Sequence, residues 1–323
     1  MMMDRSKLRI VYMGTPEFAE HSLRRLVEEG FNIVGVVTMP DKPVGRHGSV
    51  LQASPVKQYA VSQGIPVLQP ERLKDESFLS NLRALNADLQ IVVAFRMLPE
   101  VVWNMPRLGT FNLHASLLPQ YRGAAPINWA VINGDTESGV TTFFLKHEID
   151  TGDIIYQEHV PILDTDDAGS LHDKLMEVGA DLIVRTADDV LADRVTPVPQ
   201  PEISDLRPAP KIFKETCRID WNLPAVRVHD FVRGLSPYPA SWTRLVCPDG
   251  KEMDCKIYRT QVASQAIGQK PGTVVRTDGK TYIEVAAGTG TVRILELQLA
   301  GKKRMPVQAF LCGFEMTEAH SFS

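Results

Sequence analysis

Through its first 190 residues the chain alternates short apolar runs with longer segments whose apolar residues recur at helical spacing. The short runs are apolar at nearly every position, which indicates strands buried on both faces. Strands that alternate with helices predict an α/β fold: a Rossmann-like, mostly parallel sheet with helices on both faces. The expected strands are residues 9–13, 32–38, 65–68, 89–95 and 109–113, and the expected helices are 16–29, 54–63, 75–86, 126–132 and 170–191.

Two further strands are expected at 141–146 and 153–160, where apolar and polar residues alternate more strictly. Such alternation is typical of antiparallel strands near a sheet edge. The turn after the first strand, Gly14-Thr15-Pro16, lacks the second and third glycines of a dinucleotide fingerprint, which disfavours a dehydrogenase. We expect Thr15 to cap the helix that follows.

Residues 195–210 hold five prolines and no hydrophobic period, so they are expected to form an extended, stiff linker. Beyond them the pattern predicts a helix at 226–235 and then five short strands between 242 and 299, separated by Gly-containing turns. Short strands at regular spacing predict a small β-barrel or sandwich. We therefore expect a domain at 1–194, a linker at 195–210 and a second domain at 211–323.

Charge is distributed unevenly between these parts. The 323 residues carry a net charge of −4, but residues 1–204 hold 18 Lys and Arg against 27 Asp and Glu, while residues 205–323 hold 17 against 12. The parts therefore carry −9 and +5. A basic module beside an acidic domain is a hint of a nucleic-acid partner, although two unrelated domains can also simply differ in surface charge.

Polar residues gather at the end of the expected strand 109–113. Asn112 and His114 are two positions apart, so their side chains project to the same face, and Ser116 continues that parity if the strand persists. In an open parallel sheet the crevice beyond the carboxyl ends of the strands binds ligands. We therefore interpret Asn112 and His114 as candidate active-site residues, beside the alternative of a structural histidine.

A second polar cluster, His147-Glu148-Ile149-Asp150-Thr151-Gly152-Asp153, lies between the two later strands. It has three interpretations: an ordinary Gly-containing turn, an irregular metal site that matches no standard ligand spacing, or a loop that brings a carboxylate to His114. A carboxylate there would orient the imidazole and favour its protonated form. We expect no metal.

The string Asn112-x-His114-x-Ser116-Leu117-Leu118-Pro119, followed by Arg122-Gly123 and by Asp150-Thr151-Gly152-Asp153, resembles the formyltransferase family that uses 10-formyltetrahydrofolate. Further segments resemble the branch that formylates methionyl-tRNA. They are Gly14–Phe18, Pro40–Arg46, Ser54–Lys57, Arg218–Trp221, Pro271-Gly272 and Gly301–Lys303. The resemblance spans almost the whole chain and implies that the second domain is an OB-like barrel.

The resemblance also implies substrates and residue roles. The formyl donor would be 10-formyltetrahydrofolate and the acceptor the α-amino group of methionine on initiator Met-tRNA. Asn112, His114 and Asp150 would be catalytic, the first two as donors to the oxyanion and Asp150 as the partner of His114. The residues that would hold the folate are Phe95, Arg96, Met97, Leu98, Ser116, Leu117, Leu118 and Pro119. Those that would hold the tRNA acceptor arm are Lys42, Arg46, Lys211, Lys302, Lys303 and Arg304.

Three other functions remain open. A sugar-nucleotide N-formyltransferase or a formyltetrahydrofolate hydrolase would use the same Asn/His/Asp site, and only the second domain separates them from a tRNA enzyme. A non-catalytic RNA-binding protein would not require these three residues. No run of about 18 apolar residues is present, so we expect a cytoplasmic protein, and nothing demands an oligomer, so we expect a monomer.

Overall fold

The computed structural model describes residues 4–44, 50–264 and 268–323. The chain forms two compact units. The first unit contains Met1–Gly123, Ser138–Val160 and His172–Pro208, and the second contains Ala124–Glu137, Pro161–Leu171 and Ala209–Ser323. Residues 195–208 thus pack with the first unit, while two earlier stretches pack with the second. None of the described helices has the length and apolar character needed to cross a membrane.

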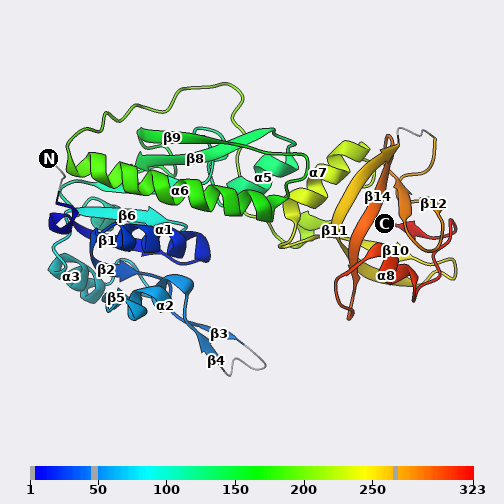
Figure 1. Cartoon of the computed structure of the whole chain (residues 1–323), viewed down its shortest axis with the longest axis horizontal. Coiled ribbons are helices and arrows are strands. Elements are labelled where there is room, and N and C mark those ends of the chain that lie inside the picture. The colour runs from blue at the N-terminus through cyan, green and yellow to red at the C-terminus, as the bar shows by residue number, and fades with distance from the viewer. Residues whose placement is uncertain (1–3, 45–49, 265–267) are drawn as a thin grey trace. The chain divides into compact units, whose positions relative to one another are not determined.

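The first unit is built on a seven-stranded sheet with the order β5-β2-β1-β6-β7-β8-β9 (Figure 1). Its strands are β1 (Arg9–Gly14), β2 (Asn32–Val37), β5 (Val67–Leu68), β6 (Leu89–Val93), β7 (Thr110–His114), β8 (Glu137–Phe144) and β9 (Ile154–Pro161). The five strands from β5 to β7 pair in parallel, and β8 pairs with β7 in the antiparallel sense. The expected parallel sheet with antiparallel strands toward one edge is confirmed.

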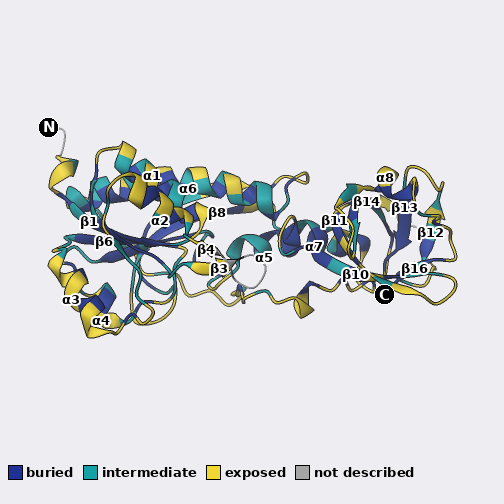
Figure 2. Cartoon of the chain, turned by 90° about the horizontal axis from the view of Figure 1, so that it is seen from below, coloured by how far each residue is buried: buried dark blue, intermediate teal, exposed yellow. Residues whose placement is uncertain are grey.

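Helices cover both faces of this sheet (Figure 2). One face carries α1 (Glu17–Glu28) and α6 (Ala168–Leu191), and the other carries α3 (Glu76–Ala84) and α4 (Glu100–Trp103). In α1 the apolar residues Phe18, Leu23 and Leu26 recur along one stripe, and all three are buried. Burial of such a stripe stabilises the helix far more than its intrinsic propensity does.

Three short elements complete the first unit. They are the 3-10 helix η1 (Arg5–Lys7), the hairpin of β3 (Lys42–Val44) and β4 (Val50–Gln52), and α2 (Pro55–Ser62). Ser54 caps α2, because its hydroxyl accepts a hydrogen bond of 3.1 Å from the Lys57 N–H. The predicted cap of α1 by Thr15 is wrong: Pro16 occupies the cap position, and the Thr15 hydroxyl is buried without a partner among the described residues.

The second unit is a small antiparallel barrel that carries helix α7 (Ala225–Leu235). The sheet order is β12-β13-β14-β11-β10-β16, and a bridge between Thr273 and Ser321 brings its two ends together. The strands are β10 (Ser241–Val246), β11 (Glu252–Ser264), β12 (Val274–Thr277), β13 (Ile283–Ala286), β14 (Thr291–Leu299), β15 (Met305–Pro306) and β16 (Ser321–Phe322). The five expected strands are present as β10 to β14, the short strands β15 and β16 were not predicted, and near-closure leaves little exposed edge.

The barrel interior is filled by apolar residues such as Trp221, Ile257 and Val285. Three short helical elements accompany it: α5 (Pro126–Ile132), the 3-10 helix η3 (Glu215–Cys217) and α8 (Val307–Leu311). Helix α5 packs against α7 within this unit, with Ile132 and Leu235 in one apolar cluster. Residues close to the polar string in sequence thus contribute to the core of the second unit.

Candidate active site

The carboxyl ends of the parallel strands β1, β6 and β7 lie at the same end of the sheet of the first unit. Because these strands are parallel neighbours, the segments that follow them start side by side: Thr15 after β1, residues 94–99 after β6 and residues 115–123 after β7. This is the end at which open α/β sheets bind ligands. The two loops expected to hold the folate are therefore brought together.

Asn112 and His114 lie on the face of the sheet opposite α6. Leu113, between them, packs against that helix so closely that a Cβ at Gly179 would lie 2.8 Å from a Leu113 methyl group. Since side chains alternate along a strand, Asn112 and His114 point the other way. Val92, the partner of Asn112 on β6, belongs to the apolar cluster under α3 and α4. The predicted shared face is confirmed.

The imidazole ring of His114 is buried, and its Nε2 atom forms a hydrogen bond within the protein. Its Nε2 lies 2.8 Å from the carbonyl oxygen of Tyr121. A carbonyl only accepts hydrogen bonds, so Nε2 carries a hydrogen and donates it. Nδ1 lies 3.9 Å from Oδ2 of Asp150, and the side chains of His114 and Asp150 are only 8% and 12% exposed. Nδ1 therefore gains a hydrogen when the ring becomes charged, next to a carboxylate.

Asp150 comes to His114 from the turn between β8 and β9. It adopts a left-handed backbone conformation, with φ at +54°. Its Oδ2 accepts a hydrogen bond of 3.0 Å from the Gly123 N–H. Two residues later Gly152 lies so close to β8 that a Cβ would stand 1.6 Å from the Phe144 carbonyl oxygen. The turn thus requires a residue without a side chain at 152.

The carboxamide oxygen of Asn112 is available to a ligand. Its Oδ1 is buried and has no hydrogen-bond partner among the described residues. A buried polar atom without a partner costs about 1–3 kcal/mol and is uncommon in a folded protein. An amide left unpaired beside a His–Asp pair is the arrangement expected when a substrate supplies the partner.

In the loop of residues 116–119, several polar groups already form hydrogen bonds with other residues of the protein. Ser116 donates from its hydroxyl to the Gln120 carbonyl at 2.7 Å. The Leu118 N–H donates to the Thr141 hydroxyl at 3.2 Å, and its carbonyl accepts from Gln157 at 2.9 Å. Leu118 and Pro119 are buried, so core packing is one role of this loop.

The loop after β6 is anchored in a similar way. Arg96 donates from Nη1 to the Glu71 carbonyl at 2.8 Å and from Nη2 to the Pro70 carbonyl. Burial lowers the pKa of Arg96. Leu98 is buried and Phe95 half-buried, whereas Met97 is 71% exposed. Of these four predicted folate residues, Met97 presents the most side-chain surface to a ligand.

The residues expected to hold tRNA are distributed over both units. In the first, Lys42 is exposed on β3, and Arg46 lies outside the described residues. In the second, Lys211, Lys302 and Lys303 are exposed. Arg304 is different, because its guanidinium donates to both carboxylate oxygens of Glu296 at 2.8 and 2.7 Å.

The side chain of Gln200, which no sequence pattern predicted, lies at the Asp150 turn beside Arg122 of the polar string. Gln200, from the proline-rich segment, donates to the carbonyl oxygens of Asp150 and Gly152, and Arg122 donates to Gln200. No spacing rule would have found this contact, since 50 residues separate Gln200 from Asp150. The only signal was that Gln200 is a polar residue among prolines.

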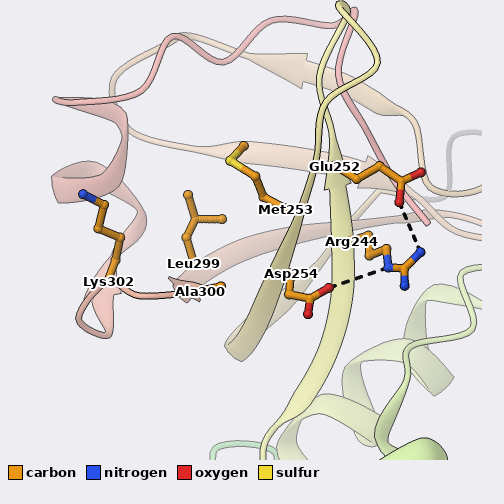
Figure 3. A pocket seen from close by; sticks show the side chains of 7 residues that line it. All are labelled: Arg244, Glu252, Met253, Asp254, Leu299, Ala300 and Lys302. Carbon is orange, nitrogen blue, oxygen red and sulfur yellow. Dashed lines mark hydrogen bonds and ion pairs between the residues drawn. The ribbon is translucent and has the colours of Figure 1, made fainter.

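A separate hollow lies on the second unit (Figure 3). It encloses about 570 Å³ and is lined by Arg244, Glu252, Met253, Asp254, Leu299, Ala300 and Lys302. Arg244 already pairs with Glu252 at 3.1 Å and with Asp254 at 3.6 Å. This hollow contains no acid–base pair of the kind found around His114.

Comparison with known proteins gives matches to both parts of the chain. Residues 7–187 match a family model described as "Formyl transferase", and residues 211–315 match one described as "Formyl transferase, C-terminal domain". A methionyl-tRNA formyltransferase of Parabacteroides distasonis is 66% identical over 317 residues, which cover 97% of this chain and 98% of the relative. One of Bacteroides thetaiotaomicron is 61% identical over 324 residues, covering 99% and 100%.

Solved structures share the fold at low sequence identity. A sugar 3N-formyl transferase, WlaRD, crystallised with dTDP and 5-N-formyl-THF, has a TM-score of 0.66 and 19% identity and covers 92% of this chain and 99% of its own. HypX from Aquifex aeolicus, in complex with tetrahydrofolic acid, has a TM-score of 0.62 and 18% identity, covering 95% and 47%. The family resemblance carried by the sequence motifs is confirmed, and the chain belongs to the formyl transferase family.

Proposed function

We propose that the protein transfers the formyl group of 10-formyltetrahydrofolate to the α-amino group of methionine on initiator Met-tRNA. The observation that carries the proposal is the buried His114–Asp150 pair, whose Nδ1 and Oδ2 atoms lie 3.9 Å apart. Asn112, whose Oδ1 has no partner among the described residues, lies on the same face of β7 as His114. The choice of acceptor is supported by relatives at 61–66% identity that are named methionyl-tRNA formyltransferase and match both units.

In this reaction the amine nitrogen attacks the formyl carbon, and negative charge develops on the formyl oxygen. Asn112 donates to that oxygen from Nδ2. His114 is the second donor, and because its Nε2 hydrogen is bound by the Tyr121 carbonyl, the donating atom is Nδ1. Only the charged imidazole has a hydrogen there, and Oδ2 of Asp150 lies 3.9 Å from that nitrogen. Donors placed before the charge develops are worth about 3–4 kcal/mol each.

The proton balance also uses His114 and Asp150. The attacking amine loses a proton, the bond between the formyl carbon and N10 breaks, and N10 takes up a proton as it leaves. Asp150 takes the proton that the amine loses, the charged His114 gives its Nδ1 hydrogen to N10, and the proton on Asp150 then passes to Nδ1, which lies 3.9 Å from Oδ2. No side chain of the protein forms a covalent bond with the formyl group.

The folate acts here as a substrate, and the residues at the carboxyl end of the sheet suit it. We propose that it lies between loop 94–99 and loop 115–119. Met97, Leu117 and the half-buried Phe95 offer apolar surface to the pterin, while the buried Leu98 anchors its loop in the apolar core. Backbone groups of both loops supply polar contacts, while Ser116, Leu118, Pro119 and Arg96 keep the loops in shape through the hydrogen bonds and packing described above.

For tRNA, we propose phosphate contacts from Lys42 and Arg46 in the first unit and from Lys211, Lys302 and Lys303 in the second. In the second unit Lys211 lies over the exposed ring of Phe213, 5.5 Å from its centroid, which places a base-stacking surface beside a cation. Arg304 is assigned a supporting role, because its charge is already paired with Glu296. We further propose that the protein works in the cytoplasm as a monomer.

A formyl-transfer assay with competing acceptors tests this proposal. Labelled 10-formyltetrahydrofolate is offered with Met-tRNA, with a nucleotide-linked amino-sugar, or with water alone. We expect label on Met-tRNA and none on the amino-sugar. Label on the amino-sugar would instead favour the function of the sugar N-formyltransferase neighbours, and free formate alone would favour a hydrolase.

A further inference from the structure

The carboxamide of Gln200 clamps the turn that presents Asp150. Its Nε2 donates to the Asp150 carbonyl oxygen at 2.7 Å and to the Gly152 carbonyl oxygen at 2.9 Å. Its Oε1 accepts from Arg122, from Nη2 at 2.6 Å and from Nε at 3.1 Å. Both hydrogens of the amide and its oxygen are therefore used, and every bond ends on the Asp150 turn or on the loop after β7.

Backbone pairing brings Gln200 to this place. Ile154 and Val198 form an antiparallel bridge, with N–H to carbonyl distances of 2.8 and 2.9 Å in the two directions. In antiparallel pairing, residue 200 lies opposite residue 152 when 198 lies opposite 154. The proline-rich segment thus runs along the start of β9 and delivers one polar side chain to the turn.

The same residues hold both partners of the candidate acid–base pair. Arg122 follows Tyr121, whose carbonyl accepts from His114, and precedes Gly123, whose N–H donates to Asp150. Gln200 joins this loop to the Asp150 turn through one carboxamide. We therefore expect loss of these hydrogen bonds to change the distance between Asp150 and His114 without altering either side chain.

We infer that Gln200 is a positioning residue: it sets the Asp150 carboxylate against His114 for formyl transfer. The inference rests on the catalytic roles proposed above for Asp150 and His114. Misplacement of a catalytic group by about 1 Å costs on the order of 100-fold in rate. We expect Gln200→Met, which keeps the length and removes the hydrogen bonds, to lower kcat about 10- to 100-fold. KM for folate and for tRNA should stay within about threefold, since neither substrate is assigned a contact with Gln200.

Gln200→Glu separates the two halves of the clamp. It keeps an acceptor for Arg122 but places a carboxylate against two carbonyl oxygens. If Gln200 acts on the Asp150 turn, this variant is at least as slow as Gln200→Met. If anchoring Arg122 were its whole role, Gln200→Glu would match the wild type, and the inference would be wrong.

Gln120→Met is the matched control. The Gln120 side chain makes a similar clamp on the same proline-rich segment, with Nε2 donating to the Asp205 carbonyl and Oε1 accepting from the Arg207 N–H, both at 2.8 Å. It has no hydrogen bond to the Asp150 turn among those described. We expect a comparable change in melting temperature for the two Met variants but a kcat within twofold of wild type for Gln120→Met.

A double-mutant cycle on the full-length enzyme with Asp150→Ala completes the test. Gln200→Met should slow the wild type 10- to 100-fold but the Asp150→Ala enzyme less than twofold, because the group that it positions is then absent. Equal losses in both backgrounds, or a wild-type rate for Gln200→Met, would overturn the inference. Near-normal turnover of Asp150→Ala itself would instead refute the proposed catalytic assignment, and the inference with it. Affinity for 5-formyltetrahydrofolate, measured by calorimetry, should stay within threefold in Gln200→Met.

Discussion

Replacement of Asn112 by alanine should slow the enzyme and stabilise it at the same time. The Asn112 carboxamide has a buried oxygen with no partner among the described residues, and it points to the same face as His114. A side chain that the fold leaves unsatisfied contributes little to folding and is available to the substrate. The two effects of its removal can be measured separately.

The loss of rate follows from the oxyanion role. Removal of one preorganised donor in other enzymes lowers kcat about 10²- to 10³-fold, or about 2.7–4 kcal/mol in the barrier. We expect Asn112→Ala to fall in this range in a single-turnover formylation assay with saturating folate and Met-tRNA. Asn112→Asp, which has the same shape but no N–H donor and a negative charge, should be slower still.

The gain in stability follows from the unpaired oxygen. An unsatisfied buried acceptor costs about 1–3 kcal/mol, and Asn112 is only half-buried, so its truncation removes little packing. A net gain of about 1 kcal/mol corresponds to a rise of about 2–4 °C in melting temperature. A kcat within threefold of wild type would refute the donor role, and a melting temperature lowered by several degrees would refute the claim that the fold leaves this amide unsatisfied.

Gly152→Ala should lower kcat about 100-fold or abolish folding of the turn, because the Phe144 carbonyl would have to move away from the new Cβ; circular dichroism separates the two outcomes. Burial raises the pKa of Cys255 to about 12, so this thiol should resist alkylation at pH 9 while the exposed Cys312 reacts, as peptide mass spectrometry would report. The unfolded chain loses the Cys255 proton near pH 9 and the folded chain keeps it, so stability in denaturant titrations should fall as the pH rises above 9, and a flat profile would contradict this. Because Arg46 and four exposed lysines are proposed to contact phosphates, raising the salt from 50 to 200 mM should weaken Met-tRNA binding about 130- to 500-fold, whereas a flat response would argue against phosphate contacts.

The proline-rich segment, residues 195–210, forms hydrogen bonds with the candidate active site in addition to connecting the two units. Its residues up to Pro208 pack with the first unit. Val198 pairs with Ile154 at the start of β9, Gln200 bonds to the Asp150 turn, and Asp205 and Arg207 bond to the loop after β7. The absence of a hydrophobic period predicted an extended chain, and none of residues 195–210 is helical. It could not predict where that chain would be held, because extended backbone pairs through groups that every residue carries.

Features that depend on neighbours along the chain could be predicted from the amino-acid sequence. Period-two and helical patterns predicted the strands and helices, because side-chain direction follows from local backbone geometry. The same rule placed Asn112 and His114 on one face of their strand. The 3.9 Å approach of Asp150 to His114 and the hydrogen bonds of Gln200 to the Asp150 turn depend on the three-dimensional packing, since these contacts join residues 36 and 50 positions apart. That packing also assigned Ala124–Glu137 and Pro161–Leu171 to the second unit. The physical reason is that packing joins surfaces of complementary shape wherever they lie in the chain, and no local pattern encodes which surfaces meet.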